Sequence, residues 1–211
     1  MDILSATAAI IEGGRRLGAR GLISAAEGNL SVRLDVDRLL VTPTGRRKDE
    51  LEPDDLVLIR PGHHDAGDGG DPPRSRSGLA PTSDLAIHLA VHAARPDLGA
   101  VVHAHLPASM ALTLAGEVPD PAALPETALL LPRLPFLPFG EMGSLELATR
   151  VAAALTVRPD PPADAVLLER HGAVAVGSDV VAAVDRLELI EVLCRTSRDA
   201  LLLRAARRAL D

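Results

Sequence analysis

Two histidines on one short apolar segment constrain this chain more than any other feature. The run Ala100-Val101-Val102-His103-Ala104-His105-Leu106 has the composition of a buried strand. Side chains alternate along a strand with a period of two, so His103 and His105 must point to the same face. Two imidazoles on one face suit a divalent transition metal, and the distant turn Arg170-His171-Gly172 offers a third. The fold is therefore expected to bring His171 beside this strand.

A site built from three histidines leaves coordination positions open, as metal sites in enzymes do. A closed structural zinc site is not expected, because the chain has one cysteine and cannot build a thiolate cage. Spacing alone leaves two interpretations open: a metal site, or three histidines that are buried and hydrogen-bonded independently. His88 and His92 lie four residues apart in a helical pattern, and we expect them to pack or to support the site.

Composition narrows the class of protein. With 211 residues, 47% of them hydrophobic, the chain is expected to form a single domain over residues 1–211. The net charge is −7 and Arg46-Arg47-Lys48 is the only basic cluster, so no nucleic-acid partner is expected. No apolar run reaches membrane-spanning length and no basic leader precedes an apolar stretch. We therefore expect a cytoplasmic protein without a membrane partner.

Apolar periodicity predicts the elements. Helices are expected over residues 3–19, from 81–84 to before 96, over 107–116, over 144–155 and over 180–209. Strands are expected over 29–34, 39–42, 56–59, 100–106, 129–131, 134–137, 165–168 and 173–176. The helix that follows Pro81-Thr82-Ser83-Asp84 should begin with a Ser/Thr cap and an acid in its first turn. Hairpins mixed with helices favour a mostly antiparallel sheet with helices packed on it.

Two absences limit the chemistry. Lys48 is the only lysine and lies in the polar stretch Arg46-Arg47-Lys48-Asp49-Glu50, which predicts a solvated loop. A lysine that forms a Schiff base needs a desolvated position, so this chemistry is not expected. Tyrosine and tryptophan are absent. A proton donor must therefore be Asp, Glu, His or a metal-bound water.

Five segments carry a resemblance to a known family. They are Gly28-Asn29-Leu30-Ser31-Val32-Arg33, Thr42-Pro43-Thr44-Gly45, Pro81-Thr82-Ser83-Asp84, Val102-His103-Ala104-His105 and His171-Gly172-Ala173-Val174-Ala175-Val176-Gly177. In this order and spacing the chain resembles the class II aldolase/adducin family, which includes L-fuculose-phosphate aldolase and ribulose-phosphate 4-epimerase. The resemblance implies a three-layer α/β/α sandwich around a mostly antiparallel sheet. It also implies a homotetramer with active sites at subunit interfaces, and Phe136, Leu137 and Phe139 are candidates to cover an interface.

The resemblance further implies roles for individual residues. Zinc, or another divalent ion, would be held by His103, His105 and His171. The phosphate of a substrate would be bound by Gly28, Asn29, Thr44, Gly45, Thr82 and Ser83. Glycine turns, hydroxyls and a helix N-terminus are groups that bind anions. Asp84 takes the place of the catalytic acid, which is usually Glu in the aldolases, and is expected to act as the base. Because the tyrosine acids of the aldolases are missing, Glu126 is our candidate replacement.

These assignments predict a zinc-dependent lyase of carbohydrate metabolism. It would make or break a C–C bond in a small phosphorylated ketose or sugar acid through a metal-stabilised enediolate. An epimerase, dehydratase or decarboxylase that uses the same enediolate is the alternative within the family. A non-catalytic adducin-like assembly module is another alternative, but it has no need of three histidines. A metal-dependent hydrolase is a third, and it would not need the anion cradle.

Overall fold

One sheet of seven strands organises the computed structural model, which describes residues 1–61, 72–156 and 161–210. The strands are β1 (Asn29–Asp35), β2 (Arg38–Val41), β3 (Val57–Ile59), β4 (Ala100–Ala104), β5 (Phe136–Leu137), β6 (Ala165–Leu168) and β7 (Gly172–Gly177). Their order across the sheet is β3-β2-β1-β4-β7-β6-β5. Every neighbouring pair is antiparallel except β5 and β6, which run parallel. The mostly antiparallel sheet is thus confirmed.

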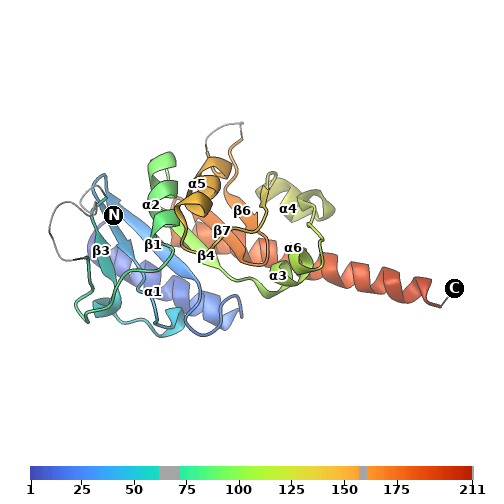
Figure 1. Cartoon of the computed structure of the whole chain (residues 1–211), viewed down its shortest axis with the longest axis horizontal. Coiled ribbons are helices and arrows are strands. Elements are labelled where there is room, and N and C mark those ends of the chain that lie inside the picture. The colour runs from blue at the N-terminus through green and yellow to red at the C-terminus, as the bar shows by residue number, and fades with distance from the viewer. Residues whose placement is uncertain (62–71, 157–160, 211) are drawn as a thin grey trace.

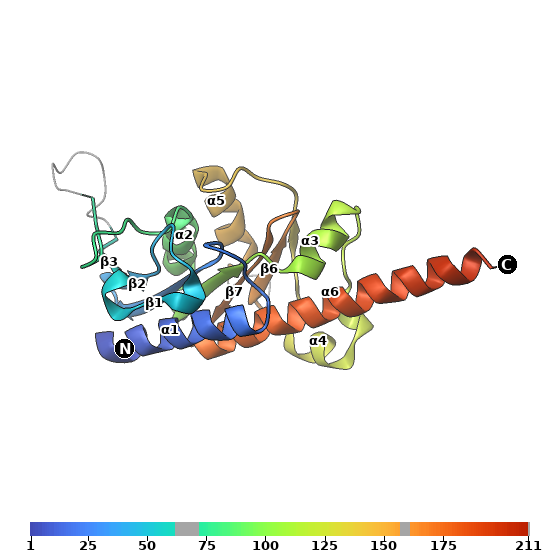
Figure 2. The same cartoon turned by 90° about the horizontal axis from the view of Figure 1, so that it is seen from below.

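Helices cover both faces of this sheet (Figures 1 and 2). They are α1 (Ile3–Ala19), α2 (Leu85–Ala94), α3 (Pro107–Leu114), α4 (Pro125–Leu130), α5 (Leu145–Ala154) and α6 (Val180–Arg208), with short 3-10 turns η1 (Lys48–Glu50), η2 (Pro53–Asp55) and η3 (Pro121–Ala123). Buried side chains of α1, α3 and α6 share one core with the sheet. Those of α2 and α5 share a second core on the opposite face. This is the three-layer α/β/α sandwich that the resemblance implied.

Alternation along the central strands decides which residues meet which helices. On β4, Ala100, Val102 and Ala104 belong to the core beneath α1 and α6, whereas Val101 belongs to the core beneath α2 and α5. His103 has the same parity as Val101 and therefore faces the α2 side. In the register of β1 with β4, Asn29 lies opposite His103. The polar positions of β1 thus lie beside the histidine strand, under α2.

One predicted element is wrong. Residues 129–131 were expected to form a strand, but residues 125–130 form helix α4, and β5 is limited to Phe136–Leu137. Pro125 occupies the first turn of α4, where its missing N–H is no loss and its fixed φ favours a helix. Leu129 and Leu130 are exposed on this helix, so these apolar residues are not part of a buried strand.

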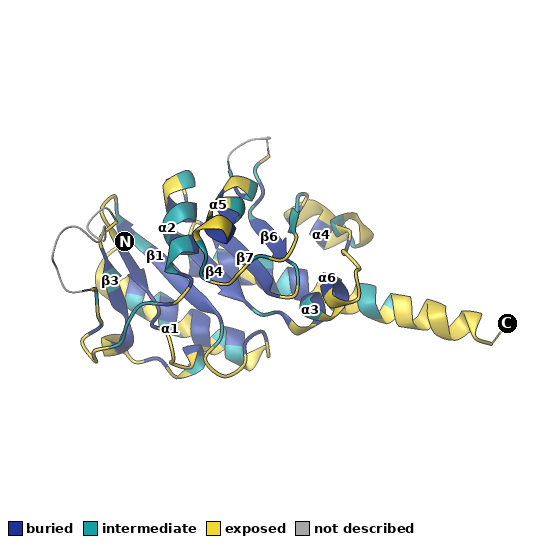
Figure 3. Ribbon diagram, viewed as in Figure 1, coloured by how far each residue is buried: buried dark blue, intermediate teal, exposed yellow. Residues whose placement is uncertain are grey.

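The last helix changes character along its length. Its first half is buried against the sheet and includes Cys194, whose thiol pKa is raised to about 12 by burial and by Glu191. Cys194 is therefore a buried and unreactive side chain. The second half extends beyond the rest of the structure and is exposed (Figure 3). No helix in the described ranges is both long and apolar enough to span a bilayer.

Candidate metal centre

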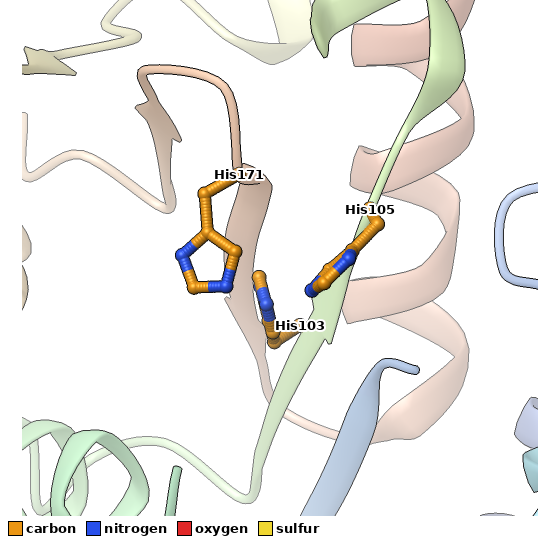
Figure 4. A group of neighbouring side chains, drawn as sticks. All are labelled: His103, His105 and His171. Atoms are coloured by element: carbon orange, nitrogen blue, oxygen red, sulfur yellow. The ribbon is translucent and has the colours of Figure 1, made fainter. Parts of the chain in front are cut away.

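Three imidazoles meet where β4 ends (Figure 4). The ring centroids of His103, His105 and His171 lie 4.7–4.9 Å from one another. Each residue offers one ring nitrogen, and these atoms all lie within 4.8 Å of one another. The predicted pairing of two neighbouring histidines with a remote third is therefore present in the structure.

A close approach of two backbones brings the third histidine to the strand. Gly172 has a φ of +88°, and a Cβ built on it would lie 2.1 Å from the carbonyl oxygen of Ala104. Only glycine permits both this conformation and this contact. Arg170, two residues earlier, also has a left-handed conformation, with a φ of +57°. The turn from β6 to β7 is thereby folded against β4, with His171 beside His105.

Hydrogen bonds orient two of the rings. The Nδ1–H of His103 donates to the carbonyl oxygen of Ala173 over 3.0 Å, and Nδ1 of His105 lies 2.7 Å from Oε2 of Glu27. These contacts leave the two Nε2 atoms for a ligand, and backbone carbonyls and carboxylates commonly orient metal-binding histidines in this way. Glu27 was not predicted from the sequence. Its only signal there is a position next to the glycine motif that begins at Gly28.

The free ring nitrogens fit a metal ion. Nε2 of His103 and Nε2 of His171 are buried and have no hydrogen-bond partner in the described structure. Burial lowers the pKa of His103 to about 3, with further lowering by His171 and His105, and burial also lowers the pKa of His171. Both rings are therefore neutral at pH 7 and offer lone pairs, as metal ligands must. A buried polar atom without a partner costs free energy of desolvation, and a coordinated ion would offset that cost.

Asp84 lies directly before α2 and does not play the part in the helix that the sequence predicted. Its side chain makes no capping hydrogen bond, and the first helical residue is Leu85. The carboxylate is buried instead, where Oδ2 accepts a hydrogen bond of 2.8 Å from Nδ2 of Asn29. Oδ1 has no partner among the described residues. Burial alone would raise the pKa of Asp84, but His103 and the Asn29 hydrogen bond hold it below its ordinary value, so the carboxylate is ionised.

A cavity of about 340 Å³ opens beside the histidines. It is lined by Asp84, His105 and His171, and by five residues of the predicted phosphate pocket, Gly28, Asn29, Thr44, Thr82 and Ser83. The sixth, Gly45, is exposed next to Thr44 with a φ of +73° and is not part of the lining. Residues from all five motif segments thus line one cavity, and the candidate base Asp84 is among them.

Glu126 is not brought to this cavity. It lies exposed in the first turn of α4 and is absent from the lining that the described residues form. Within one chain, the structure gives Glu126 no contact with the histidines.

Lys48 is the opposite case, because the predicted solvated loop is wrong at this residue. Its side chain is 1% exposed and lines the cavity. The ammonium group donates to the carbonyl oxygens of Ala26 and Arg46, both over 2.7 Å. Burial lowers the pKa of Lys48 to about 8, although Asp84 acts in the opposite direction. The signal available in the sequence is the pair Gly13-Gly14 inside a helix, which marks the close approach of another segment.

Comparison with known proteins agrees with this geometry. The family model described as "Class II Aldolase and Adducin N-terminal domain" matches residues 8–197. Over 185 residues the chain is 34% identical to the "5-methylthioribulose-1-phosphate/5-deoxyribulose-1-phosphate aldolase" of Rhodospirillum rubrum, covering 87% of this chain and 76% of that protein. It is 31% identical over 201 residues to the "Methylthioribulose-1-phosphate dehydratase" of Acidiphilium cryptum, covering 91% and 90%.

A solved structure shares the fold. The crystal structure of L-fuculose-1-phosphate aldolase from Thermus thermophilus superposes with a TM-score of 0.76 at 27% identity, covering 95% of this chain and 96% of that one. The relatives thus include an aldolase and a dehydratase at similar identity.

Proposed function

The chain belongs to the class II aldolase and adducin family, and from this premise we propose that it is a zinc-dependent lyase. Its reaction would make or break a C–C bond in a small phosphorylated ketose or sugar acid. The observation that carries the proposal is the convergence of His103, His105 and His171 beside a cavity that also holds an ionised carboxylate.

The three histidines would hold the metal. A divalent ion bound there supplies Lewis-acid chemistry toward substrate oxygens. Zinc is our first choice, because neutral imidazoles in a three-histidine set are common zinc ligands. Other divalent transition metals also bind imidazole nitrogens, and which of them occupies the site depends partly on their availability.

Asp84 would move the proton. Its Oδ2 is held by Asn29, while Oδ1 is unpartnered in a residue that lines the cavity formed by the described residues. An ionised carboxylate of this kind accepts a proton from a substrate carbon or hydroxyl that lies within hydrogen-bond distance. It can return the proton in a later step, so one residue serves both directions. Glu126 could take part only from a neighbouring subunit, because its own chain does not bring it to the cavity.

The phosphate group would bind in the same cavity. Gly28, Thr44, Thr82 and Ser83 line it on turns and just before α2, where backbone N–H groups and hydroxyls are available. We assign Asn29 and Gly45 to the same pocket. Lys48, buried at the cavity wall, contributes positive charge to it.

A dehydratase is the second candidate, since the Acidiphilium cryptum relative has that name and lies at nearly the same identity as the aldolase. An epimerase or decarboxylase of the same family would need the same metal and base. The adducin-like assembly module is the weakest alternative, because it requires neither unpartnered histidine nitrogens nor an ionised acid beside them.

A substrate screen tests the proposal. Protein loaded with zinc is incubated with a panel of phosphorylated ketoses and sugar acids, and products are identified by mass. C–C cleavage or its reversal supports the lyase; loss of water, loss of CO₂ or epimerisation supports a sister reaction. No turnover of any member would contradict an enzyme of this class.

Elemental analysis tests the metal centre separately. The purified protein should carry close to one divalent transition metal per chain, and His103→Ala, His105→Ala and His171→Ala should each lose it. His88→Gln, which removes a histidine outside the triad, is the matched control. Full metal in all three triad variants would contradict the assignment.

A further inference from the structure

A continuous line of polar side chains, buried except for the half-buried Arg33, runs between α2 and β1 and ends at Asp84. Asn29, Ser31 and Arg33 alternate on β1 and point to the face that α2 covers, where His88 and His92 lie one helical turn apart. The contacts, in order, are Arg33 Nη2 to His92 Nδ1 at 3.2 Å, His92 Nε2 to Ser31 Oγ at 2.9 Å, Ser31 Oγ to His88 Nδ1 at 2.7 Å, His88 Nε2 to Asn29 Oδ1 at 2.6 Å, and Asn29 Nδ2 to Asp84 Oδ2 at 2.8 Å.

The two ends of this line determine the position of every proton between them. A guanidinium group can only donate, so Nδ1 of His92 must accept and its Nε2 must carry the proton. An ionised carboxylate can only accept, so the amide NH₂ of Asn29 faces Asp84 and its Oδ1 faces His88. His88 must then carry its proton on Nε2 and accept at Nδ1 from the hydroxyl of Ser31. All five hydrogen bonds therefore point from Arg33 to Asp84.

Burial makes this arrangement stiff. Ser31 and His88 are fully buried, and Asn29 and His92 are 3% exposed. Burial lowers the pKa of His88 to about 4 and that of His92 to about 3, so both rings are neutral, as the single proton on each ring requires. Arg33 is anchored at the other end, because its Nε donates to the carbonyl oxygen of Leu98 and its Nη2 to that of His92. Since every ring nitrogen has a partner, the histidine pair is not a second metal site.

We propose that Arg33, His92, Ser31 and His88 are positioning residues that act through Asn29 to hold Asp84, so that Oδ1 is its proton-transferring oxygen. The inference rests on the proposed role of Asp84 as the base. A buried network with all its members satisfied rigidifies its surroundings, and aligned hydrogen bonds polarise one another. The line therefore fixes both the rotamer of Asp84 and the orientation of the Asn29 amide, which also lines the cavity.

Nitrogen NMR tests the proton order without any substrate. In protein labelled with ¹⁵N at histidine, the resonances of His88 and His92 are assigned from the spectra of His88→Gln and His92→Gln. At pH 7 both rings should show the neutral form with the proton on Nε2. A charged ring, or a proton on Nδ1 of either ring, would overturn the order derived above.

Kinetics test the positioning role. Ser31→Ala removes the central hydroxyl at little cost in volume. The value of kcat should fall about 10-fold, KM should change less because Asn29 is one of several residues assigned to the phosphate pocket, and metal content should stay unchanged. Ser109→Ala is the matched control, because Ser109 is equally buried but its hydroxyl donates to the carbonyl oxygen of Leu106, outside the line. If Ser31→Ala does not fold, Arg33→Met and Arg33→Lys replace it: the methionine should lower kcat, and the lysine, still a donor only, should restore most of it.

The outcomes separate this inference from the proposed function. If Ser31→Ala has the same kcat as Ser109→Ala, the positioning role is contradicted, even if Asp84 is the base. If the arginine variants are used instead, equal kcat in Arg33→Met and Arg33→Lys contradicts the positioning role. Full turnover in Asp84→Asn contradicts the proposal that Asp84 is the base. The positioning inference then fails with it, even if the NMR spectrum shows the derived order of protons.

Discussion

Asp84 has one buried carboxylate oxygen, Oδ1, with no hydrogen-bond partner in the described part of the chain, and this is the atom on which the proposed chemistry depends. Asp84→Asn keeps the size of the side chain and an oxygen that can accept from Asn29, but it removes the base. Turnover should fall by about 10²–10⁴-fold, the usual contribution of a placed proton-transfer group. Metal content, measured by elemental analysis, should stay at the parental level. Near-parental turnover would place the base elsewhere, with Glu126 of a neighbouring subunit or a metal-bound hydroxide as the next candidates.

Lys48 should make the free energy of unfolding depend on pH in the alkaline range. Its pKa is about 8 in the folded protein against 10.5 for an unperturbed lysine, so between these values the unfolded chain binds more protons than the folded one. The free energy of unfolding should therefore rise with pH across this window relative to Lys48→Met, by up to about 3 kcal/mol.

Urea unfolding of both proteins at pH 7.5 and at pH 10 measures the difference. Lys48→Met also leaves the carbonyl oxygens of Ala26 and Arg46 without their donor, but that cost is the same at both pH values. A difference in stability that does not change with pH would show that the lysine is not desolvated in the folded protein.

At the scale of the elements, the packing of α1 on η1 explains why Lys48 is buried. A Cβ built on Gly14 would lie 1.9 Å from the carbonyl oxygen of Lys48, so the helix and the 3-10 turn touch backbone to backbone. This contact holds the polar stretch around residue 48 in close packing against α1. The Lys48 side chain is consequently buried at the cavity wall, where its ammonium group donates to the two carbonyl oxygens.

Gly14→Ala should therefore destabilise the protein by about 1–3 kcal/mol, as overpacking does. The sign is diagnostic, because glycine in a helix interior is ordinarily less stable than alanine by about 0.5–1 kcal/mol. Thermal or urea unfolding measures the change, and Glu12→Ala, on the exposed side of the same helix, should stay within about 0.5 kcal/mol of the parent. A stabilised Gly14→Ala protein would mean that η1 can move away freely.

At the scale of the whole molecule, apolar side chains remain exposed in places that a partner subunit could cover. The projecting half of α6 is exposed along its length (Figure 3). Its residues Leu202 and Leu203 are more than 60% exposed. Phe139 is 55% exposed, beneath the Arg170 guanidinium at 4.6 Å, whereas Phe136 and Leu137 are half-buried in β5. Of the three candidates that the sequence suggested, Phe139 is the one most available to an interface.

We expect a homotetramer with active sites at subunit interfaces because the resemblance to the family implies one, and exposed apolar side chains are the kind of surface that association covers. Light scattering at micromolar concentration should give about four times the chain mass of 22.0 kDa. A monomer mass would remove both the tetramer and any catalytic group supplied by a neighbouring subunit. The single domain, the cytoplasmic location and the absence of a nucleic-acid partner stay predictions.

Periodicity made much of the site predictable. The period of two placed His103 and His105 on one face, and the helix period placed His88 and His92 together, because both repeats are properties of the local backbone. The strand expected at residues 129–131 was wrong for the same reason. An apolar run of three residues is too short to show a period, and Pro125, in the first turn of α4, favours the helix that contains Leu129 and Leu130.

The sequence by itself determined the alternation of helices and strands, the faces on which the histidines lie and the exclusion of a thiolate metal site. Only the tertiary structure decided what these faces meet. It buried Lys48 against α1, brought Glu27 to His105 and left Glu126 outside the cavity. It also linked Arg33 to Asp84 through His92 and His88. These histidines are 59 and 57 residues away in sequence from Arg33 and Ser31, the residues of β1 that they contact. Local repeats fix directions along one element, whereas burial and partnership depend on which distant element packs against it, and no local pattern encodes that.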